Sequence, residues 1–244
     1  MSLAADLRTL YHLTLAPIRG TSHAERLESF YGPQAAAYDR FRERLLHGRA
    51  ELFRSIPHPP GARWLDLGGG TAANLEFLGK RLQEIEQVYV VDLSASLLAV
   101  AKQRVLAHGW QNVELVRADA AQFEPPGNTV DVVSCSYSLT MMPDWFTVID
   151  HAWDLLRPGG VIGVTDFFVS RTHAEQGLAQ HGWWTRHFWP AWFARDNVHL
   201  SADHLPYLQR RFETVSLDQL RAPVPYLPGL RVPYYRFVGC KPAR

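Results

Sequence analysis

The stretch that decides the fold is WLDLGGGTAAN, residues 64–74. It joins a short apolar run, RWLDL at 63–67, to TAANLEFLGKRL at 71–82, which has the periodicity of a helix. Glycines at such a junction let the backbone approach a ligand, and the first turn of a helix offers free N–H groups. The stretch therefore predicts a buried strand, a ligand-binding turn and a helix.

The same alternation continues on both sides of this turn. Apolar runs predict further strands at 88–93, 113–119, 131–138 and 160–167, and helical spacing predicts helices at 34–54, 94–109 and 145–156. Strands that alternate with helices of this length are typical of a parallel sheet covered on both faces. Near the C-terminus we expect a helix at 203–212 and two closing strands at 213–220 and 232–239. The sequence thus predicts a doubly wound, Rossmann-like α/β fold.

The 244 residues are expected to form one domain with four parts. These are a helical N-terminal extension at 1–56, a cofactor-binding core at 62–168, an aromatic insertion at 169–202, and a closing helix and strands at 203–244. The insertion stands out because it is rich in Trp and His and breaks the strand–helix alternation.

Charge and composition exclude several classes of protein. The 25 basic residues nearly balance the 24 acidic ones, so no overall field attracts nucleic acid. The two cysteines, Cys135 and Cys240, are too few for a disulfide framework or a zinc module. No secretory signal or apolar stretch long enough to cross a bilayer is recognised, so we expect a cytoplasmic protein.

Two cofactors fit the glycine turn. Gly68, Gly70 and Ala73 match the G-x-G-x-x-G/A pattern of dinucleotide-binding turns. The same turn fits D-x-G-x-G-x-G, the nucleotide loop of S-adenosylmethionine-dependent methyltransferases, with Ala72 in place of the last glycine. An NAD-dependent oxidoreductase and a methyltransferase therefore both remain open at this point.

Three acids at successive strand ends favour the second alternative. Asp66 is expected to aim a carboxylate at the turn, which suits a ligand with an ammonium and a sulfonium group but would repel a pyrophosphate. Asp92 is placed to accept both hydroxyls of a ribose, and Asp119 to meet the exocyclic amine of an adenine. Leu93 and Ala120 would then supply apolar faces to the ring.

At this point the chain resembles the class I methyltransferases, and more narrowly the methyltransferase module of betaine-lipid synthases, which trimethylates the amine of diacylglycerylhomoserine. The resemblance covers nearly the whole chain. It implies a mostly parallel seven-stranded sheet, an N-terminal helical lid and S-adenosyl-L-methionine as the cofactor. The blocks that carry it are FYGPQAAAYDRFRERLLHGR (30–49), WLDLGGGTAAN (64–74), SYSLTMMPDWF (136–146), GVTDFF (163–168), GWWTRHFWPAWFARDNVHLS (182–201) and VPYYRFVG (232–239).

The resemblance also implies a set of site residues. The expected cofactor-binding residues are Asp66, Gly68, Gly69, Gly70, Asp92, Leu93, Asp119, Ala120, Ser136 and Arg49. Tyr31 and Tyr38 in the lid are candidates for positioning the acceptor amine. The expected substrate-binding residues are Arg42, Tyr137, Trp184 and Arg186, with the arginines as partners of a headgroup carboxylate.

The tryptophans suggest contact with a membrane. A lipid acceptor sits in a bilayer, and Trp rings suit the headgroup layer. Trp184, Phe188 and Trp192 recur at four-residue spacing on one helical face, although Pro190 would disturb that helix. A second candidate anchor is the N-terminal stripe that includes Leu7, Leu10, Tyr11, Thr14 and Ile18. Alternatively, both stripes pack in the core. For residues 183–193 we expect a mixture, with some rings lining the acceptor site.

The histidines give no ligand set with metal-binding spacing, so no metal site is expected. The sequence favours a peripheral membrane enzyme that transfers methyl groups to a lipid headgroup amine. Phosphatidylethanolamine N-methylation is the nearest alternative, and a lipid-binding module without enzymatic activity is a further one. The number of methyl transfers and the oligomeric state stay open.

Overall fold

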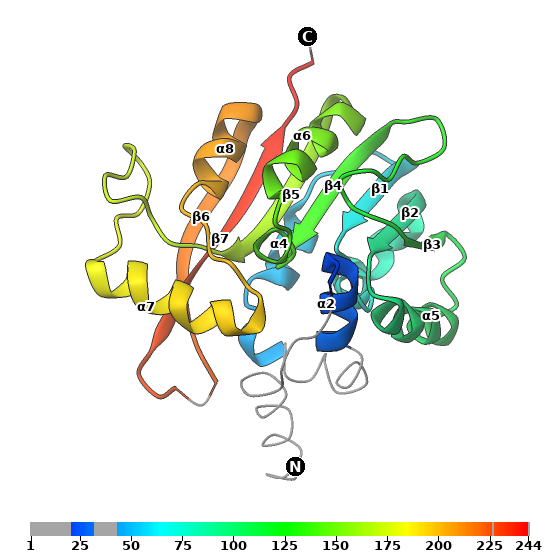
Figure 1. Ribbon diagram of the computed structural model, residues 1–244. Helices are drawn as coiled ribbons and strands as arrows, with labels where there is room; N and C mark the ends of the chain where they lie inside the picture. Colours follow the sequence, from blue (N-terminus) through cyan, green and yellow to red (C-terminus); the bar gives the residue numbers. More distant parts are fainter. Residues whose placement is uncertain (1–20, 32–42, 226, 244) are drawn as a thin grey trace.

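The computed structural model describes residues 21–31, 43–225 and 227–243. Its centre is a seven-stranded sheet with the order β3-β2-β1-β4-β5-β7-β6 (Figure 1). The strands are β1 (Ala62–Leu67), β2 (Ile85–Asp92), β3 (Val113–Arg117), β4 (Val130–Ser136), β5 (Leu156–Phe167), β6 (Glu213–Pro223) and β7 (Arg231–Cys240). The first five are parallel, and β7 is antiparallel to both β5 and β6. The predicted mostly parallel, Rossmann-like seven-stranded sheet is confirmed.

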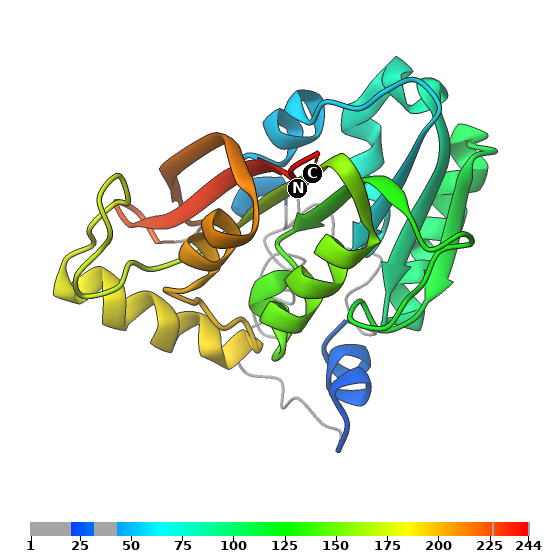
Figure 2. The same ribbon diagram turned by 90° about the horizontal axis from the view of Figure 1, so that it is seen from above.

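Helices cover both faces of the sheet (Figure 2). The helical elements are α2 (His23–Tyr31), α4 (Arg49–Ser55), η2 (Ala73–Glu84), α5 (Ala95–His108), η3 (Leu139–Met141), α6 (Trp145–Leu155), α7 (Trp183–Phe193), η4 (Ala194–Asp196) and α8 (His204–Arg211). Apolar residues of α4, η2 and α5 pack on one face, and those of α6 and α8 pack on the other.

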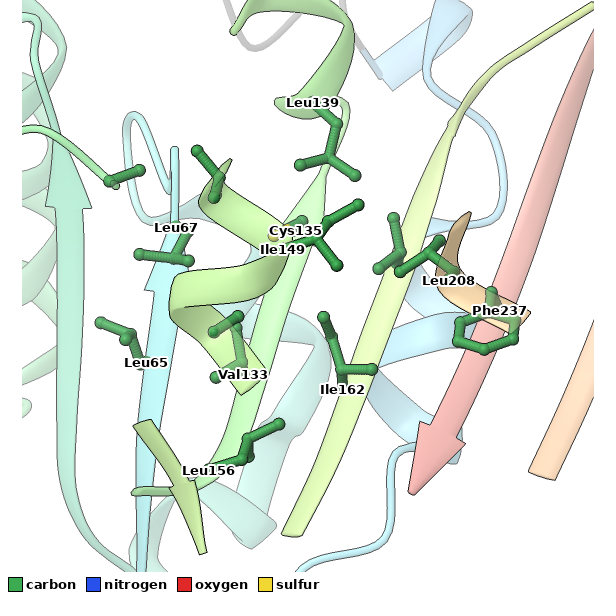
Figure 3. Close-up of a cluster of buried hydrophobic side chains, with 14 of the residues drawn as sticks. Leu65, Leu67, Val133, Cys135, Leu139, Ile149, Leu156, Ile162, Leu208 and Phe237 are labelled. Carbon is green, nitrogen blue, oxygen red and sulfur yellow. The ribbon is translucent and has the colours of Figure 1, made fainter. Parts of the chain in front are cut away.

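The core on the α6 and α8 face is built from strand residues at alternate positions (Figure 3). Leu65 and Leu67 of β1 lie beside Val133 and Cys135 of β4, because every second side chain of a strand points to the same face. Ile149 of α6 packs over them. Since both faces of the parallel strands are buried, their central parts form apolar runs, as VYVV (88–91) of β2 does.

Local sequence signals explain the ends of α5. Ser94 is the N-cap, and its hydroxyl accepts a hydrogen bond from the backbone N–H of Leu97. Gly109 ends the helix in a left-handed conformation, with φ of 65°, as a C-terminal glycine commonly does.

Two elements differ from their predicted form. The helix after the glycine turn is a 3₁₀ element, η2, interrupted at Gly79, where φ is 56°. Strand β5 begins at Leu156, directly after α6, and not at 160. The strand starts early because Leu156 pairs with Val130, before an irregularity in the register of β4. The side chain of Lys241, near the C-terminus, also donates through Nζ to the carbonyl of Leu156.

The N-terminal predictions are tested only in part. The expected helix at 34–54 is described from residue 43 onward, and there it is broken before Arg49 by Gly48, whose φ is 81°. The stripe from Leu7 to Ile18 lies outside the described residues. Within the described part of the chain, no helix is long and apolar enough to cross a membrane, and no group of three metal-ligating side chains comes together.

Candidate functional site

A cavity of about 200 Å³ opens at the carboxyl ends of the parallel strands. This is the edge at which doubly wound sheets bind ligands. Helix α2 closes it on one side, and the loop after β4 closes it on another. Its lining consists of Leu27, Tyr31, Leu46, Arg49, Gly68, Gly69, Gly70, Thr71, Ala73, Asn74, Val91, Asp92, Leu93, Leu97, Ala118, Asp119, Ala120, Ala121, Ser136, Tyr137, Ser138, Met141, Met142, Pro143, Asp144 and Val148.

The predicted glycine turn forms the floor of this cavity. Gly68 and Gly70 have φ values of 71° and 57°, which favour glycine because L side chains are strained there. At Gly69 the requirement is space, since an added Cβ would lie 2.7 Å from the carboxylate oxygen Oδ2 of Asp66. Ala72, which replaces the usual last glycine, also has a left-handed φ of 57° and directly precedes η2.

Asp66 lies behind the turn and not in the cavity. It is fully buried and is absent from the lining, so its expected direct contact with a cofactor is corrected to a role beneath Gly69. Its Oδ1 accepts a hydrogen bond from the Ser134 hydroxyl at 2.5 Å. Burial raises the pKa of this carboxyl to about 7, because the charged form loses its hydration.

Asp92 lines the cavity at the end of β2 and also organises the turn. Its Oδ2 accepts from the backbone N–H of Gly70 at 2.9 Å, and its Oδ1 accepts from Ser94 N–H at 2.8 Å. Ser94 in turn donates through its hydroxyl to Glu28 of α2. A carboxylate fixed in this way presents its remaining lone pairs to the cavity, as recognition of ribose hydroxyls requires.

The end of β3 supplies the third predicted wall. Leu93, Asp119 and Ala120 all line the cavity, and Ala120 is buried. The carboxylate of Asp119 accepts a hydrogen bond from Ala121 N–H at 2.9 Å, which fixes its position at the rim. An apolar slot with a carboxylate at its edge suits a purine with an exocyclic amine.

Arg49 provides the basic group of the cavity wall. It is buried, donates to the carbonyl of Leu46 through Nε at 3.2 Å, and lies 3.4 Å from Oδ1 of Asn74. Its guanidinium also stands 5.7 Å from the centre of the Phe77 ring. A buried guanidinium and a side-chain amide at the start of η2 are suitable partners for a ligand carboxylate.

Three serines at alternate positions on β4 and just beyond it differ in their partners. Ser134 accepts from Trp64 Nε1 at 2.8 Å and donates to Asp66. Ser136 and Ser138 line the cavity and are only 7% and 4% exposed, yet neither hydroxyl makes a hydrogen bond within the described chain. Ser138 does approach the Cys135 thiol, which is a weak partner.

Tyr137 separates these two serines in a strained conformation. Its φ is 54°, a left-handed value that is uncommon for a bulky residue and is typical of functional sites. The backbone N–H of Tyr137 donates to the Thr165 carbonyl, and its phenol donates to the His47 carbonyl at 2.7 Å. Burial raises the pKa of this phenol well above its usual value, so the group is neutral.

The predicted acceptor residues are placed in different regions. Tyr31 is buried in the cavity wall, and Tyr137 lines the cavity. Tyr38 and Arg42 lie outside the described residues. Trp184 is 73% exposed on α7, and neither it nor Arg186 belongs to the cavity lining, so the structure corrects their expected place in the acceptor site.

Helix α7 has an exposed end and a buried end. Trp183 and Trp184, at its start, are exposed, whereas Trp189 and Phe193 are buried against Phe167 and its neighbours. Phe188 and Trp192 are partly buried and stack on each other. Trp184, Phe188 and Trp192 therefore do not form one exposed face, because the rings of Phe188 and Trp192 close over the aromatic cluster. The helix combines exposed and buried rings.

Several lining residues were missed by the sequence analysis. Leu27, Asn74, Ser138, Met141 and Met142 line the cavity. The signal for Asn74 was its place at the end of the glycine turn. Ser138 and the two methionines belong to SYSLTMMPDWF, a block quoted for the resemblance, and could have been found as the loop that follows the fourth strand.

Comparison with known proteins agrees with this geometry. Residues 65–160 match the family model described as a methyltransferase domain. A demethylmenaquinone methyltransferase from Geobacillus kaustophilus is 32% identical over 145 residues, which are 57% of this chain and 62% of that protein. A ubiquinone/menaquinone biosynthesis C-methyltransferase from Hahella chejuensis is 26% identical over 66% of this chain and 67% of that protein.

The fold is shared with solved structures at lower identity. A Haemonchus contortus phosphoethanolamine N-methyltransferase in complex with S-adenosyl-L-methionine superposes with a TM-score of 0.68. That similarity has 17% identity and covers 93% of this chain and 61% of the other. The chain thus spans less than two thirds of the length of the first curated relative above and of this structure.

Proposed function

We propose that this chain transfers methyl groups from S-adenosylmethionine to the amine of a membrane-lipid headgroup, with diacylglycerylhomoserine as the acceptor. The match of residues 65–160 to a methyltransferase domain supports S-adenosylmethionine over NAD, the choice that the glycine turn left open.

The observation that carries the proposal is a cavity lining that combines charged groups with apolar side chains. We expect Asp92 and Arg49 to serve the polar ends of the cofactor, and Leu27, Met141 and Met142 to form the apolar part of the lining. An amine that enters this apolar part is held in its neutral form, because burial disfavours the ammonium ion. A neutral amine is the form that can accept a methyl group.

When bound, S-adenosylmethionine supplies a methyl group on a sulfonium, which is reactive without further activation. The chain's own residues then have to orient the amine and exclude water. Arg49 and Asn74 would hold the carboxylate end of the cofactor, Asp92 its ribose, and Asp119 its adenine. A strong base beside the acceptor is not required when the nucleophile is a neutral amine.

Access to a lipid acceptor is supported by the exposed end of α7. Trp183 is 61% exposed, and its ring packs edge-on against that of Trp184 and stacks on His187. Large exposed aromatic rings of this kind partition into the headgroup layer of a bilayer. In this proposal the pair anchors the chain peripherally, and the resemblance to betaine-lipid synthases supports the same acceptor.

A second candidate is C-methylation of a quinone precursor. It is favoured by the names of the two curated relatives, which are a demethylmenaquinone methyltransferase and a ubiquinone/menaquinone C-methyltransferase. It predicts that the preferred acceptor has a ring carbon and not an amine as its nucleophile.

The test is methyl transfer from labelled S-adenosylmethionine into mixed vesicles. Separate vesicles contain diacylglycerylhomoserine, phosphatidylethanolamine or reduced demethylmenaquinone, and the lipids are separated after reaction. We expect label in the first lipid. Label in phosphatidylethanolamine alone or in the quinone alone would contradict the proposed acceptor. The variant Asp92→Ala serves as the control for cofactor-dependent transfer.

A further inference from the structure

Three serines on β4 and just beyond it allow the hydrogen bonding of their hydroxyls to be compared. Ser134, Ser136 and Ser138 are the same residue type within five positions, but among the described residues only the Ser134 hydroxyl has strong hydrogen-bond partners, and Ser138 approaches only the Cys135 thiol. A buried hydroxyl without a partner is costly, so such groups in native proteins commonly meet a ligand or water. The two unsatisfied hydroxyls are the two that line the cavity.

The side chain of Ser138 also does not cap the helical turn that it precedes. It is the N-cap of η3, where a serine side chain commonly accepts a backbone hydrogen bond, but its side chain makes no such bond. It lies against the first glycine of the turn, since a Cβ added at Gly68 would be 3.2 Å from the Ser138 hydroxyl. Its hydroxyl is therefore adjacent to the cofactor-binding turn.

The conformation of Tyr137 is what separates the two hydroxyls. The strand ends at Ser136, and the left-handed turn at Tyr137 carries Ser138 beyond the sheet toward Met141 and Met142. Ser136 stays at the strand end, where the resemblance to methyltransferases implies a cofactor contact. Ser138 lies beside Met142 of the apolar lining, since both approach a Cβ added at Gly68, and this is where the proposed acceptor would enter.

We infer that Ser138 is the positioning residue for the acceptor amine, an inference that rests on the proposed function. The Ser138 hydroxyl accepts a hydrogen bond from an N–H of the neutral amine and leaves the nitrogen lone pair directed at the methyl group. As the N–C bond forms, the S–C bond breaks and its electron pair stays on sulfur. The nitrogen takes the positive charge and then loses one proton to water, except in the last transfer.

This role distinguishes the successive methyl transfers. A neutral primary or monomethylated amine has an N–H to donate, whereas a dimethylated amine has none. Ser138 therefore assists the first two transfers and contributes nothing by this hydrogen bond to the third. A residue that only maintained the shape of the cavity would affect all three transfers alike.

The experiment compares Ser138→Ala with the wild type on vesicles that contain diacylglycerylhomoserine, its monomethyl form or its dimethyl form. We expect kcat/KM to fall about tenfold for the first two acceptors, as for loss of one hydrogen bond, and to stay within about twofold for the third. The Kd for S-adenosylhomocysteine, measured by calorimetry, is expected to stay within about twofold.

Two further variants serve as matched controls. Ser134→Ala removes a satisfied buried hydroxyl and is expected to lower the free energy of unfolding, whereas Ser138→Ala is not, because its hydroxyl has no strong partner to lose. Ser136→Ala is expected to weaken binding of S-adenosylhomocysteine. Ser134→Ala thus shows the effect of lost stability, and Ser136→Ala shows the effect of weaker cofactor binding. Both can then be told apart from weaker handling of the acceptor by Ser138→Ala.

Three results would overturn the inference. One is an equal loss of kcat/KM on the dimethyl acceptor, another is weaker cofactor binding by Ser138→Ala, and the third is unchanged kcat/KM on all three acceptors. If the wild type methylates none of the amines, the proposed function fails first and the inference fails with it. Wild-type activity combined with any of the three results rejects the role of Ser138 alone.

Discussion

Two regions of the molecule, the cofactor side of the cavity and an aromatic side whose rings lie outside the cavity lining apart from Tyr137, are built by different means. The cofactor side, formed by the glycine turn with Asp92 and Asp119, places backbone N–H groups and carboxylates at the ends of parallel strands. The aromatic side, formed by α7 and the rings beneath it, consists of side chains stacked on side chains. The ring centres of Tyr137 and Phe167 are 4.6 Å apart, and those of Phe167 and Phe193 are 4.8 Å apart.

The difference shows which kind of site a sequence can predict. On the cofactor side the position of each group follows from its place in a strand, so a short motif specifies the geometry. On the aromatic side the position of each ring depends on partners from the loop after β4, from β5, β6 and β7 and from α7, which are far apart in the chain. The following predictions test whether stability and ligand binding divide between the two sides in the same way.

The largest expected effect is on the aromatic side. Phe193→Ala removes a buried ring from the cluster with Phe167 and Trp189, and should lower the free energy of unfolding by about 3–5 kcal/mol. Denaturant unfolding measures this loss. Binding of S-adenosylhomocysteine to the folded variant should change little. A stability loss below about 1 kcal/mol would show that the cluster is not packed as described.

The next effect is on the cofactor side. Asp92→Ala removes the acceptor of Gly70 N–H and the expected partner of the ribose, so the Kd for S-adenosylhomocysteine should rise by about 10- to 100-fold, or roughly 1.5–3 kcal/mol. Calorimetry measures the change. Asp92→Asn keeps one oxygen and should lose less affinity. An unchanged Kd for Asp92→Ala would place the ribose elsewhere.

The third effect is a dependence of the free energy of unfolding on pH, caused by Asp66 beneath the glycine turn. The pKa of Asp66 is about 7 in the folded chain and 3.8 for the ordinary carboxyl. Because the folded chain binds this proton more tightly, the free energy of unfolding should fall as pH rises from about 4 to about 7, by up to about 1.4 kcal/mol per pH unit.

Asp66→Asn should reduce this slope, because the amide does not titrate. The fold should tolerate the change, since the amide oxygen can still accept from Ser134 and the second carboxylate oxygen has no hydrogen-bond partner in the described chain. Asp166 is the matched control. Burial also raises its pKa to about 7, but both of its oxygens accept hydrogen bonds, so Asp166→Asn should destabilise the fold as well. A slope unchanged in Asp66→Asn would mean that Asp66 is not the titrating group.

The smallest effect concerns the exposed end of α7. Trp184→Ala should change the free energy of unfolding by no more than about 0.5 kcal/mol, because the ring is mostly in solvent. Together with Trp183→Ala it should reduce sedimentation with vesicles while the Kd for S-adenosylhomocysteine stays the same. Full vesicle binding by the double variant would refute the anchor. Trp189→Phe, within the buried end, is the control that should leave vesicle binding intact.

Sequence reasoning predicted the sheet and the cofactor side well because both depend on local periodicity and on strand ends. All seven strands were found within a few residues, and the structure places Gly70, Asp92 and Asp119 in one cavity. Asp66 was misplaced because alternation along β1 sends its side chain beneath the turn, a direction that the motif does not encode. The partners of the rings at 188 and 192 could not be predicted for a related reason, since helical spacing does not tell which face of a helix finds a partner.

The left-handed conformation of Tyr137 has a consequence for engineering. A tyrosine held at φ of 54° costs of order 1–3 kcal/mol that a glycine or an asparagine would largely recover. Either replacement would nevertheless lose more than it recovers, because the buried ring packs against Phe167 and its phenol donates to the His47 carbonyl. Variants selected for heat resistance should therefore keep tyrosine here, and with it the loop geometry that carries Ser138.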